Sequence, residues 1–480
     1  MRKKCCIIVV VCVLFCLLIV GLWLAFFRGG GQSDRHEAKE RLNSAASQMD
    51  TCTVKAVFRP DEKTLAVTQD ITFENRTGEA LQSIVLRFYA SAYASEDTAP
   101  GATEELFDAS YGDSFSAGGC SFMGAWTDGE AVKTTWLDDA ETALSIPVSL
   151  EDGQTCALTL RYVLSIPDCA HRFGAADDVY RFLDALAVVA PYADGAWRTE
   201  EYSSIGEPFM VSCMNYDVTL TLPDGWMALG SGFQEADGAY HTSVSAARGF
   251  AFVILPKEEL TNVSVQGVTL RTVKSRKKTL DTLKTALNAL VSLYGDLPQD
   301  TLDVCVTSYA LDFGSYSGLI VLDEDADETA LLRAAARQWF GVLVGSDGYE
   351  QAWLSDALSE WALLRCVQKT EGQDAYEHLK KELVDEPMRE NITASVTAGC
   401  PVDYFSDRAT YDAVVRGRGA AYLFALDEMT GSRVDEFLRQ LCDNYAYSIL
   451  SREAFEEKMT DFSGMDIVPL ALDYLDTYMD

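Results

Sequence analysis

The sequence has few basic residues and few histidines. Its 480 residues include 39 lysines and arginines against 73 aspartates and glutamates, which gives a formal net charge of −34. Nucleic acids bind basic patches, so this balance excludes nucleic acid as a partner. The chain has only four histidines, which are scattered at His36, His171, His241 and His378. Histidine spacing therefore gives no sign of a zinc site.

Paired cysteines are also absent. Nine of the 13 cysteines follow residue 30, and no C-x-x-C pair occurs among them. This scatter argues against a zinc ribbon or a disulfide framework, and we expect most of these cysteines to be small buried apolar residues. The chain also lacks a G-x-S-x-G motif, a P-loop and a dinucleotide fingerprint. These absences remove the sequence support for serine-hydrolase and nucleotide chemistry.

A long apolar run is present near the N-terminus. Residues 5–27 contain no charged residue, and about twenty apolar residues can cross roughly 30 Å of hydrocarbon as a helix. Arg2, Lys3 and Lys4 precede the run and only Arg28 follows it closely, which predicts a cytoplasmic N-terminus. We expect a single-pass protein of the cell membrane, anchored by this helix, with its main body extracellular. A cleaved signal peptide is the alternative.

The pattern of apolar residues divides the chain into segments. Residues 1–33 comprise the cytoplasmic tip, the anchor and a glycine linker, and residues 34–50 are polar and helix-forming, which suits a short stalk. Residues 51–260 alternate apolar and polar side chains, which predicts an antiparallel β-sandwich. Residues 261–480 have helical spacing instead, as in the apolar series Leu280, Leu283, Leu287, Leu290 and Tyr294. The chain is therefore expected to be an α+β multidomain protein.

Residues 333–366, RAAARQWFGVLVGSDGYEQAWLSDALSEWALLRC, resemble the zinc region of the aminopeptidase N family. The family pattern is H-E-x-x-H followed by Q-W-F-G, and then W-L-N-E-G-F-A-E-Y. Eighteen residues separate Arg337 from Asp356, as they separate the second histidine from the third zinc ligand in the family. The parts of the pattern that remain are Gln338, Trp339, Phe340, Gly341, Trp353, Leu354 and Glu360.

Two more segments carry the same resemblance. Residues 188–223 are similar to a segment of bacterial members in which apolar-Pro-Tyr, Gly-x-Trp and Gly-Asp-Pro-Phe follow one another. Residues 411–431, which begin with Tyr411, resemble the helix that carries the catalytic tyrosine in a Y-x-K-G motif. The resemblance spans roughly residues 50–480 and implies a β-sandwich followed by a thermolysin-like, mainly helical domain of the gluzincin metallopeptidase type.

The residues that the family uses for catalysis are replaced here. Arg333 and Arg337 stand at the two histidine positions, and a guanidinium has no lone pair to give to Zn²⁺. Ala334 replaces the general base, Asp356 replaces the third ligand, and Arg416 stands at the place of the tyrosine. We therefore expect neither a catalytic residue nor a bound metal, although active relatives use zinc.

The exopeptidase motif of the family, G-x-M-E-N, is also altered. The segment 314–321 reads GSYSGLIV, in which Ser315 is nearest to the missing glutamate and Tyr316 follows it. The resemblance implies that this glutamate captures the free amine of the substrate in active members. Its absence adds to the prediction of a pseudoenzyme.

The charges at these positions leave two readings of the emptied cleft. Arg333, Arg337 and Asp356 sum to +1, and Arg416 would add another positive charge. Such a cluster could bind an acidic peptide or protein ligand. In the second reading, Asp356 and Glu360 pair with the arginines and close the cavity.

Three functions remain open from the sequence. The first is an inactive metallopeptidase homologue that binds peptides or proteins outside the cell. The second is an active metallo-aminopeptidase with an unforeseen constellation of residues, and the third is a structural or receptor-like ectodomain.

Overall fold

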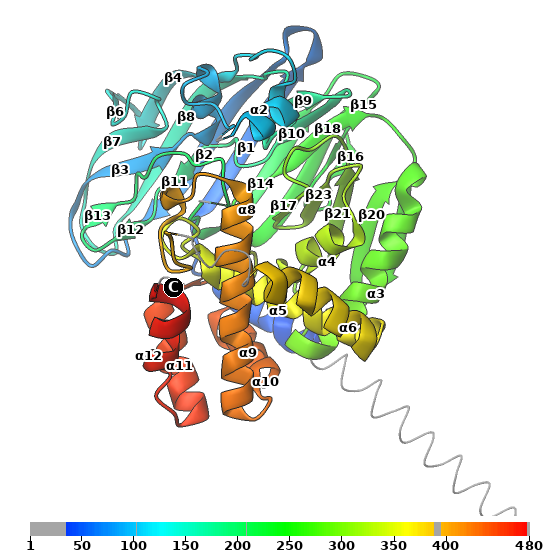
Figure 1. The fold of residues 1–480 in the computed structure, drawn as a ribbon. Helices are drawn as coiled ribbons and strands as arrows, with labels where there is room; N and C mark the ends of the chain where they lie inside the picture. Colours follow the sequence, from blue (N-terminus) through cyan, green and yellow to red (C-terminus); the bar gives the residue numbers. More distant parts are fainter. Residues whose placement is uncertain (1–34, 102, 208, 388–394, 478–480) are drawn as a thin grey trace, which may run out of the picture.

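A computed structural model describes residues 35–101, 103–207, 209–387 and 395–477 of the chain. The predicted membrane segment, residues 5–27, lies outside the described residues. Within them, no helix is long and apolar enough to cross a bilayer. The expected α+β architecture is confirmed: strands dominate the first half of the chain, and helices dominate the second half (Figure 1).

The first half is built around an eight-stranded sheet. Its order is β16 (Gln234–Ala236), β17 (Ala239–Arg248), β14 (Cys213–Thr221), β1 (Thr51–Arg59), β2 (Thr64–Glu74), β8 (Thr155–Ser165), β4 (Gly119–Thr127) and β5 (Glu130–Val132). Neighbours pair in antiparallel fashion except β1 and β14, which are parallel. The predicted alternation is confirmed in β8. Its buried side chains include Leu158, Leu160, Tyr162 and Leu164, and the residues that alternate with them are partly or fully exposed.

Two four-stranded sheets pack against this large sheet. One contains β15 (Trp226–Leu229), β18 (Phe252–Pro256), β10 (Val179–Phe182) and β9 (Phe173–Ala176), and the other contains β11 (Val188–Val189), β3 (Leu81–Arg87), β7 (Ala143–Leu150) and β6 (Thr135–Trp136). Side chains from all three sheets share one apolar core. Outside these sheets lie the helix α2 (Glu104–Tyr111) and the hairpin of β12 (Tyr192–Ala193) and β13 (Ala196–Trp197).

The second half combines a five-stranded sheet with helices. The sheet order is β19 (Leu260–Val265), β20 (Val268–Val273), β21 (Thr301–Val306), β23 (Leu319–Leu322) and β22 (Phe313–Tyr316). The helices are α3 (Lys277–Tyr294), α4 (Glu328–Ala336), α5 (Ala352–Thr370), α6 (Gln373–Lys380), α8 (Arg408–Tyr411), α9 (Gly419–Thr430), α10 (Val434–Tyr445), α11 (Arg452–Ser463) and α12 (Val468–Ala471). The leucine series of α3 is buried as predicted, and the helix ends before Gly295. A short parallel pair, β24 (Gly345–Ser346) and β25 (Ile449–Leu450), joins two loops.

The segment that precedes the sandwich packs against the body. Residues 35–46 are helical, and Ala38 on this helix is buried. Arg35 Nη1 donates a hydrogen bond to the carbonyl oxygen of Leu297 at 2.9 Å, and Lys39 Nζ lies 2.6 Å from Asp300 Oδ1. This helix is therefore attached to the second half of the chain at the loop between α3 and β21.

The nine cysteines in the described part of the chain are all free, and seven of them are buried. Burial raises the pKa of the Cys366 thiol to about 12. The expectation that most cysteines are buried apolar residues is confirmed.

Candidate functional site

Two helices, α4 and α5, bring four of the predicted site residues together. The α4 helix starts after Asp327, whose side chain accepts a hydrogen bond from the backbone N–H of Ala330. Arg333 lies on α4 and Arg337 follows its last turn, four residues apart, so the two side chains share one face. On α5, Asp356 and Glu360 are also four residues apart. The two carboxylates of α5 therefore face the two cations of α4 and the turn that follows it.

The first pair is a forked one. Arg333 Nε lies 2.7 Å from Glu360 Oε2, and Arg333 Nη2 lies 3.0 Å from Glu360 Oε1. Glu360 is 1% exposed. Two parallel hydrogen bonds to a buried carboxylate are the strongest geometry that an arginine can adopt in an ion pair.

The second cation, Arg337, bridges two carboxylates. Its Nη1 donates to Asp356 Oδ1, and its Nη2 donates to Glu207 Oε2 at 2.5 Å. The hydroxyl of Tyr411 donates to the other oxygen of Asp356, also at 2.5 Å. Burial, together with the negative charge of Asp356, holds the pKa of Tyr411 well above its usual value, so this hydroxyl keeps its proton.

Arg416 completes the cluster from a π-helical turn, Asp412–Arg418, that continues α8. Its Nη1 lies 2.6 Å from Asp412 Oδ1, and its Nε lies 3.7 Å from Asp356 Oδ2. Burial alone would raise the pKa of Asp356, but Arg337 and Arg416 outweigh this effect and lower the pKa below its usual value. Asp356 therefore stays ionised.

The cluster as a whole is charge-compensated. It contains three guanidiniums and four carboxylates, which gives a formal charge of −1. The sequence count of +1 or +2 omitted Glu360, Glu207 and Asp412, so the structure corrects it. We name this set the arginine cluster: Arg333, Arg337, Arg416, Glu207, Asp356, Glu360 and Asp412, with Tyr411.

The segment that carries Glu207 covers the arginine cluster. A Cβ atom on Gly206, which has φ of +69°, would lie 2.8 Å from the hydroxyl of Tyr411. A Cβ atom on Gly348 would lie 2.0 Å from the carbonyl oxygen of Glu207. The cavities that flank the segment measure only about 30 and 60 Å³. They have room for a few waters, each of which needs about 10–15 Å³ by this measure.

The retained family motif forms core structure around this cluster. Gln338 Nε2 donates to Ser315 Oγ at 2.8 Å and to the Tyr316 carbonyl oxygen at 3.1 Å, and Ser315 Oγ donates to the Ala334 carbonyl oxygen at 2.9 Å. Trp339 is fully buried, and its indole N–H donates to the Gly295 carbonyl oxygen. Of the other motif residues, Phe340, Trp353 and Leu354 are buried, and Gly341 has φ of +135°. These side chains support α4 and α5.

Sequence reasoning missed two carboxylates of the cluster. Asp412 lies four residues before Arg416, which is the spacing of a helical ion pair and could have been noticed. Glu207 lies in the segment with the Gly-Asp-Pro-Phe resemblance, where Glu207 occupies the aspartate position. It is 130 residues from Arg337 in the chain, and spacing gave no sign of their contact.

The chain has the fold of the M1 zinc metallopeptidases. An M1 zinc metallopeptidase from Deinococcus radiodurans superimposes with a TM-score of 0.63 at 16% identity, over 90% of this chain and 93% of that one. A mutant form with a bound Tyr-Ser-Ala substrate has the same score and identity. Yeast LTA4 hydrolase has a TM-score of 0.61 at 11% identity, over 89% of this chain and 67% of the hydrolase. No sequence-family model and no curated protein matches the chain.

This fold implies a zinc ion, and the residues present do not fit one. The resemblance aligns the two helical ligands with Arg333 and Arg337, whose guanidiniums are protonated and offer only donors. Asp356, which the resemblance aligns with the third ligand, already accepts hydrogen bonds from Arg337 and Tyr411. Among the described residues, no group of three or more His, Cys, Asp or Glu side chains is arranged to hold a metal. No reaction step through zinc follows from this arrangement.

Proposed function

We propose that this chain is a non-catalytic relative of the M1 zinc peptidases, of the aminopeptidase N type. It is anchored in the cell membrane and binds peptides or proteins outside the cell. The observation that carries the proposal is the position of Arg337. Its guanidinium occupies a ligand position of the fold and bridges Asp356 and Glu207, so a cation of the protein itself holds the carboxylates together.

No residue of the arginine cluster can perform the chemistry of peptide hydrolysis. Hydrolysis by this fold requires a metal-activated water and a general base. Ala334, at the position of the general base, has only a methyl side chain and is fully buried. Arg416, at the tyrosine position, could stabilise an anion but is engaged with Asp412. The proposal is therefore one of binding without cleavage.

The arginine cluster is also a poor receptor for an acidic peptide. Such a ligand would have to displace Asp356 and Glu207 from Arg337, and it would have to enter cavities of about 30 and 60 Å³. The proposal therefore assigns the ligand to another surface of the ectodomain.

Zinc analysis and an activity assay test the loss of catalysis. The purified chain is expected to contain far less than one zinc per molecule after zinc loading and desalting, by elemental mass spectrometry. It should release no nitroaniline from a panel of aminoacyl-nitroanilides, and EDTA should leave its melting temperature unchanged. A zinc-containing aminopeptidase treated in parallel is the control. Stoichiometric zinc together with turnover would show that the chain is an active peptidase.

Protease treatment of intact cells tests the location. An epitope tag placed before Arg2 should be protected, whereas a tag placed after Asp480 should be removed. Protection of both tags would contradict an extracellular body, and loss of the N-terminal tag during biosynthesis would indicate signal cleavage.

A further inference from the structure

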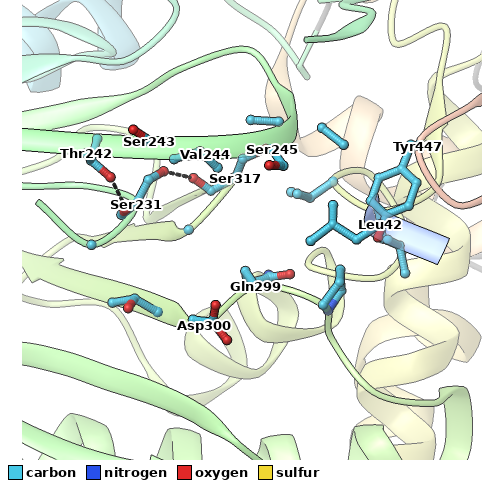
Figure 2. Close-up of a pocket in the computed structure, with 18 of the residues that line it drawn as sticks. Leu42, Ser231, Thr242, Ser243, Val244, Ser245, Gln299, Asp300, Ser317 and Tyr447 are labelled. Atoms are coloured by element: carbon cyan, nitrogen blue, oxygen red, sulfur yellow. Dashed lines mark hydrogen bonds between the residues drawn. The ribbon is translucent and has the colours of Figure 1, made fainter. Parts of the chain in front are cut away.

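A groove far larger than the cavities beside the arginine cluster lies along strand β17. It has a volume of about 500 Å³, within the range of about 300–1,000 Å³ that is usual for ligand sites. One wall is β17, and the facing wall is the loop 298–300 with the first residue of β21 (Figure 2). Leu42 and Tyr447 close one end, as Figure 2 shows. We name it the β17 groove.

The β17 wall presents an open strand edge to the groove. In the large sheet, β17 lies between β14 and β16, and β14 pairs with it along most of its length. The short strand β16 pairs only with residues 239–241. From Thr242 to Ser245, no strand in the described residues pairs with β17 on the side away from β14. An unpaired edge of this kind is a template for a further strand.

A bulge limits the length of this edge. Ser245 and Ala246 together oppose Asn215 of β14, because the register shifts between Met214 and Tyr216. Ala246 has φ of +51°, which is unusual for a residue with a side chain. Bulges often end strand pairing and re-aim side chains beside binding sites. The regular open edge is therefore four residues, or about 13 Å, long.

The ends of the open edge are fixed by hydroxyl groups. Thr242 Oγ1 donates to the Ser231 carbonyl oxygen at 2.6 Å, and Ser231 Oγ donates to the Ser317 carbonyl oxygen at 2.5 Å (Figure 2). Ser317 Oγ accepts from the backbone N–H of Arg248 at 2.9 Å. Between these ties the strand edge is held in place without being covered, which makes it a preorganised surface.

The charges of the groove favour a basic ligand. Asp300 is already paired with Lys39 at 2.6 Å and with Arg35 at 3.1 Å. Asp217 is exposed and accepts a hydrogen bond from Ser243 Oγ at 2.7 Å. No cation among the described residues forms an ion pair with Asp217. This lone carboxylate, in a chain of net charge −34, would attract a positive side chain.

We propose that the β17 groove binds an extended, basic peptide segment, which adds as a strand to residues 242–245. Backbone hydrogen bonds to the open edge hold the peptide, in the manner of other strand-addition complexes. A basic side chain reaches Asp217, and the end formed by Leu42 and Tyr447 accepts an apolar side chain. This inference rests on the proposed function in one respect, that the ligand is bound and not cleaved.

Titration calorimetry of the full chain with capped peptides tests the proposal. The probe is acetyl-KVTVK-amide, and the comparison peptide is acetyl-EVTVE-amide. We expect saturable binding of the lysine peptide, and at least tenfold weaker binding of the glutamate peptide. Two further lysine peptides carry N-methyl groups on alternate residues, in opposite phase. Only the N–H groups on one edge of the added strand donate hydrogen bonds to β17, so one of these two peptides should still bind. The fully N-methylated peptide should not bind.

Two variants locate the site. Ser245→Trp places a large ring on an exposed position of the groove and should weaken binding at least tenfold. Ser149→Trp makes the same change at an exposed position of β7, outside the groove, and should bind as the parent does. Equal melting temperatures of the variants would show that both fold.

Several outcomes would overturn the inference. Absence of saturable binding, binding that Ser245→Trp leaves unchanged, or equal binding of the fully N-methylated peptide would each refute strand addition at β17. Tight binding of the glutamate peptide would refute the role of Asp217. Mass spectrometry of the recovered probe separates this inference from the proposed function, since a cleaved probe refutes the latter wherever the peptide binds.

Discussion

Replacement of Arg337 by alanine is the sharpest test of the arginine cluster. The Arg337 side chain is 5% exposed, and the Asp356 carboxylate that it contacts is also 5% exposed. Removing one partner of a buried ion pair costs about 3–5 kcal/mol, because the other charge is left without compensation. Asp356 keeps Tyr411 and the more distant Arg416, and Glu207 is 26% exposed and can reach water. The lower part of that range, about 3 kcal/mol, is therefore expected.

The melting temperature reports this loss. A change of 1 kcal/mol corresponds to about 2–4 °C in a cooperative unit of 150–250 residues, so Arg337→Ala should melt roughly 6–12 °C below the parent. The pKa of Asp356 is lowered in the folded state. The contribution of its ion pairs to the free energy of unfolding is therefore present above the unfolded pKa of about 3.9, and it is lost as the pH falls through the folded pKa. The difference between parent and variant should therefore narrow below about pH 4.

An exposed ion pair supplies the matched control. Lys274 and Glu259 lie 2.7 Å apart with both side chains more than half exposed, and such pairs contribute little to stability. Lys274→Ala should melt as the parent does. If Arg337→Ala also melts within 2 °C of the parent while remaining folded by circular dichroism, the arginine cluster does not stabilise the site and the reasoning fails.

Two further predictions concern buried charges. Arg333→Lys should lower the melting temperature, because one ammonium group cannot replace the two hydrogen bonds that the guanidinium makes to Glu360; equal melting of the two proteins would contradict the forked pair. Burial raises the pKa of Asp184 to about 7. Between about pH 4 and pH 7 the carboxyl is therefore ionised in the unfolded chain but protonated in the folded one, so the free energy of unfolding falls as the pH rises through this range. Asp184→Asn, whose side chain tolerates the positive φ of this residue, should therefore raise the melting temperature more at pH 7.5 than at pH 5, and a gain independent of pH would refute the assignment.

Much of the fold could be predicted from periodicity and from the family resemblance. Alternating apolar residues marked strands such as β8, and helical spacing marked α3 together with its end at Gly295. The register between Arg337 and Asp356 placed α4 and α5 correctly as partners. These features depend on local pattern, or on a motif whose geometry the resemblance supplies. The predicted membrane helix lies outside the described residues and stays a prediction.

The composition of the site could be predicted only in part. Positions 333, 337, 356 and 416 were singled out because the resemblance aligns them with motif residues of the family, and the structure brings them together. Glu207 was missed because its contact depends on how a loop of the sandwich crosses the second half of the chain. The open edge of β17 was also invisible, because the sequence of an edge strand does not reveal which of its sides lacks a partner.

The charges of the arginine cluster are chemically coherent. The cluster holds four carboxylates, Glu207, Asp356, Glu360 and Asp412, and without the guanidiniums they would be left largely uncompensated, at a cost of several kcal/mol. Arg333 and Arg337 supply this positive charge from one face of α4 and the turn that follows it. Glu207 and Tyr411 fill the space beside these guanidiniums. The proposed function therefore places the ligand on a surface that is already open, and the β17 groove, with a volume of about 500 Å³, meets that condition.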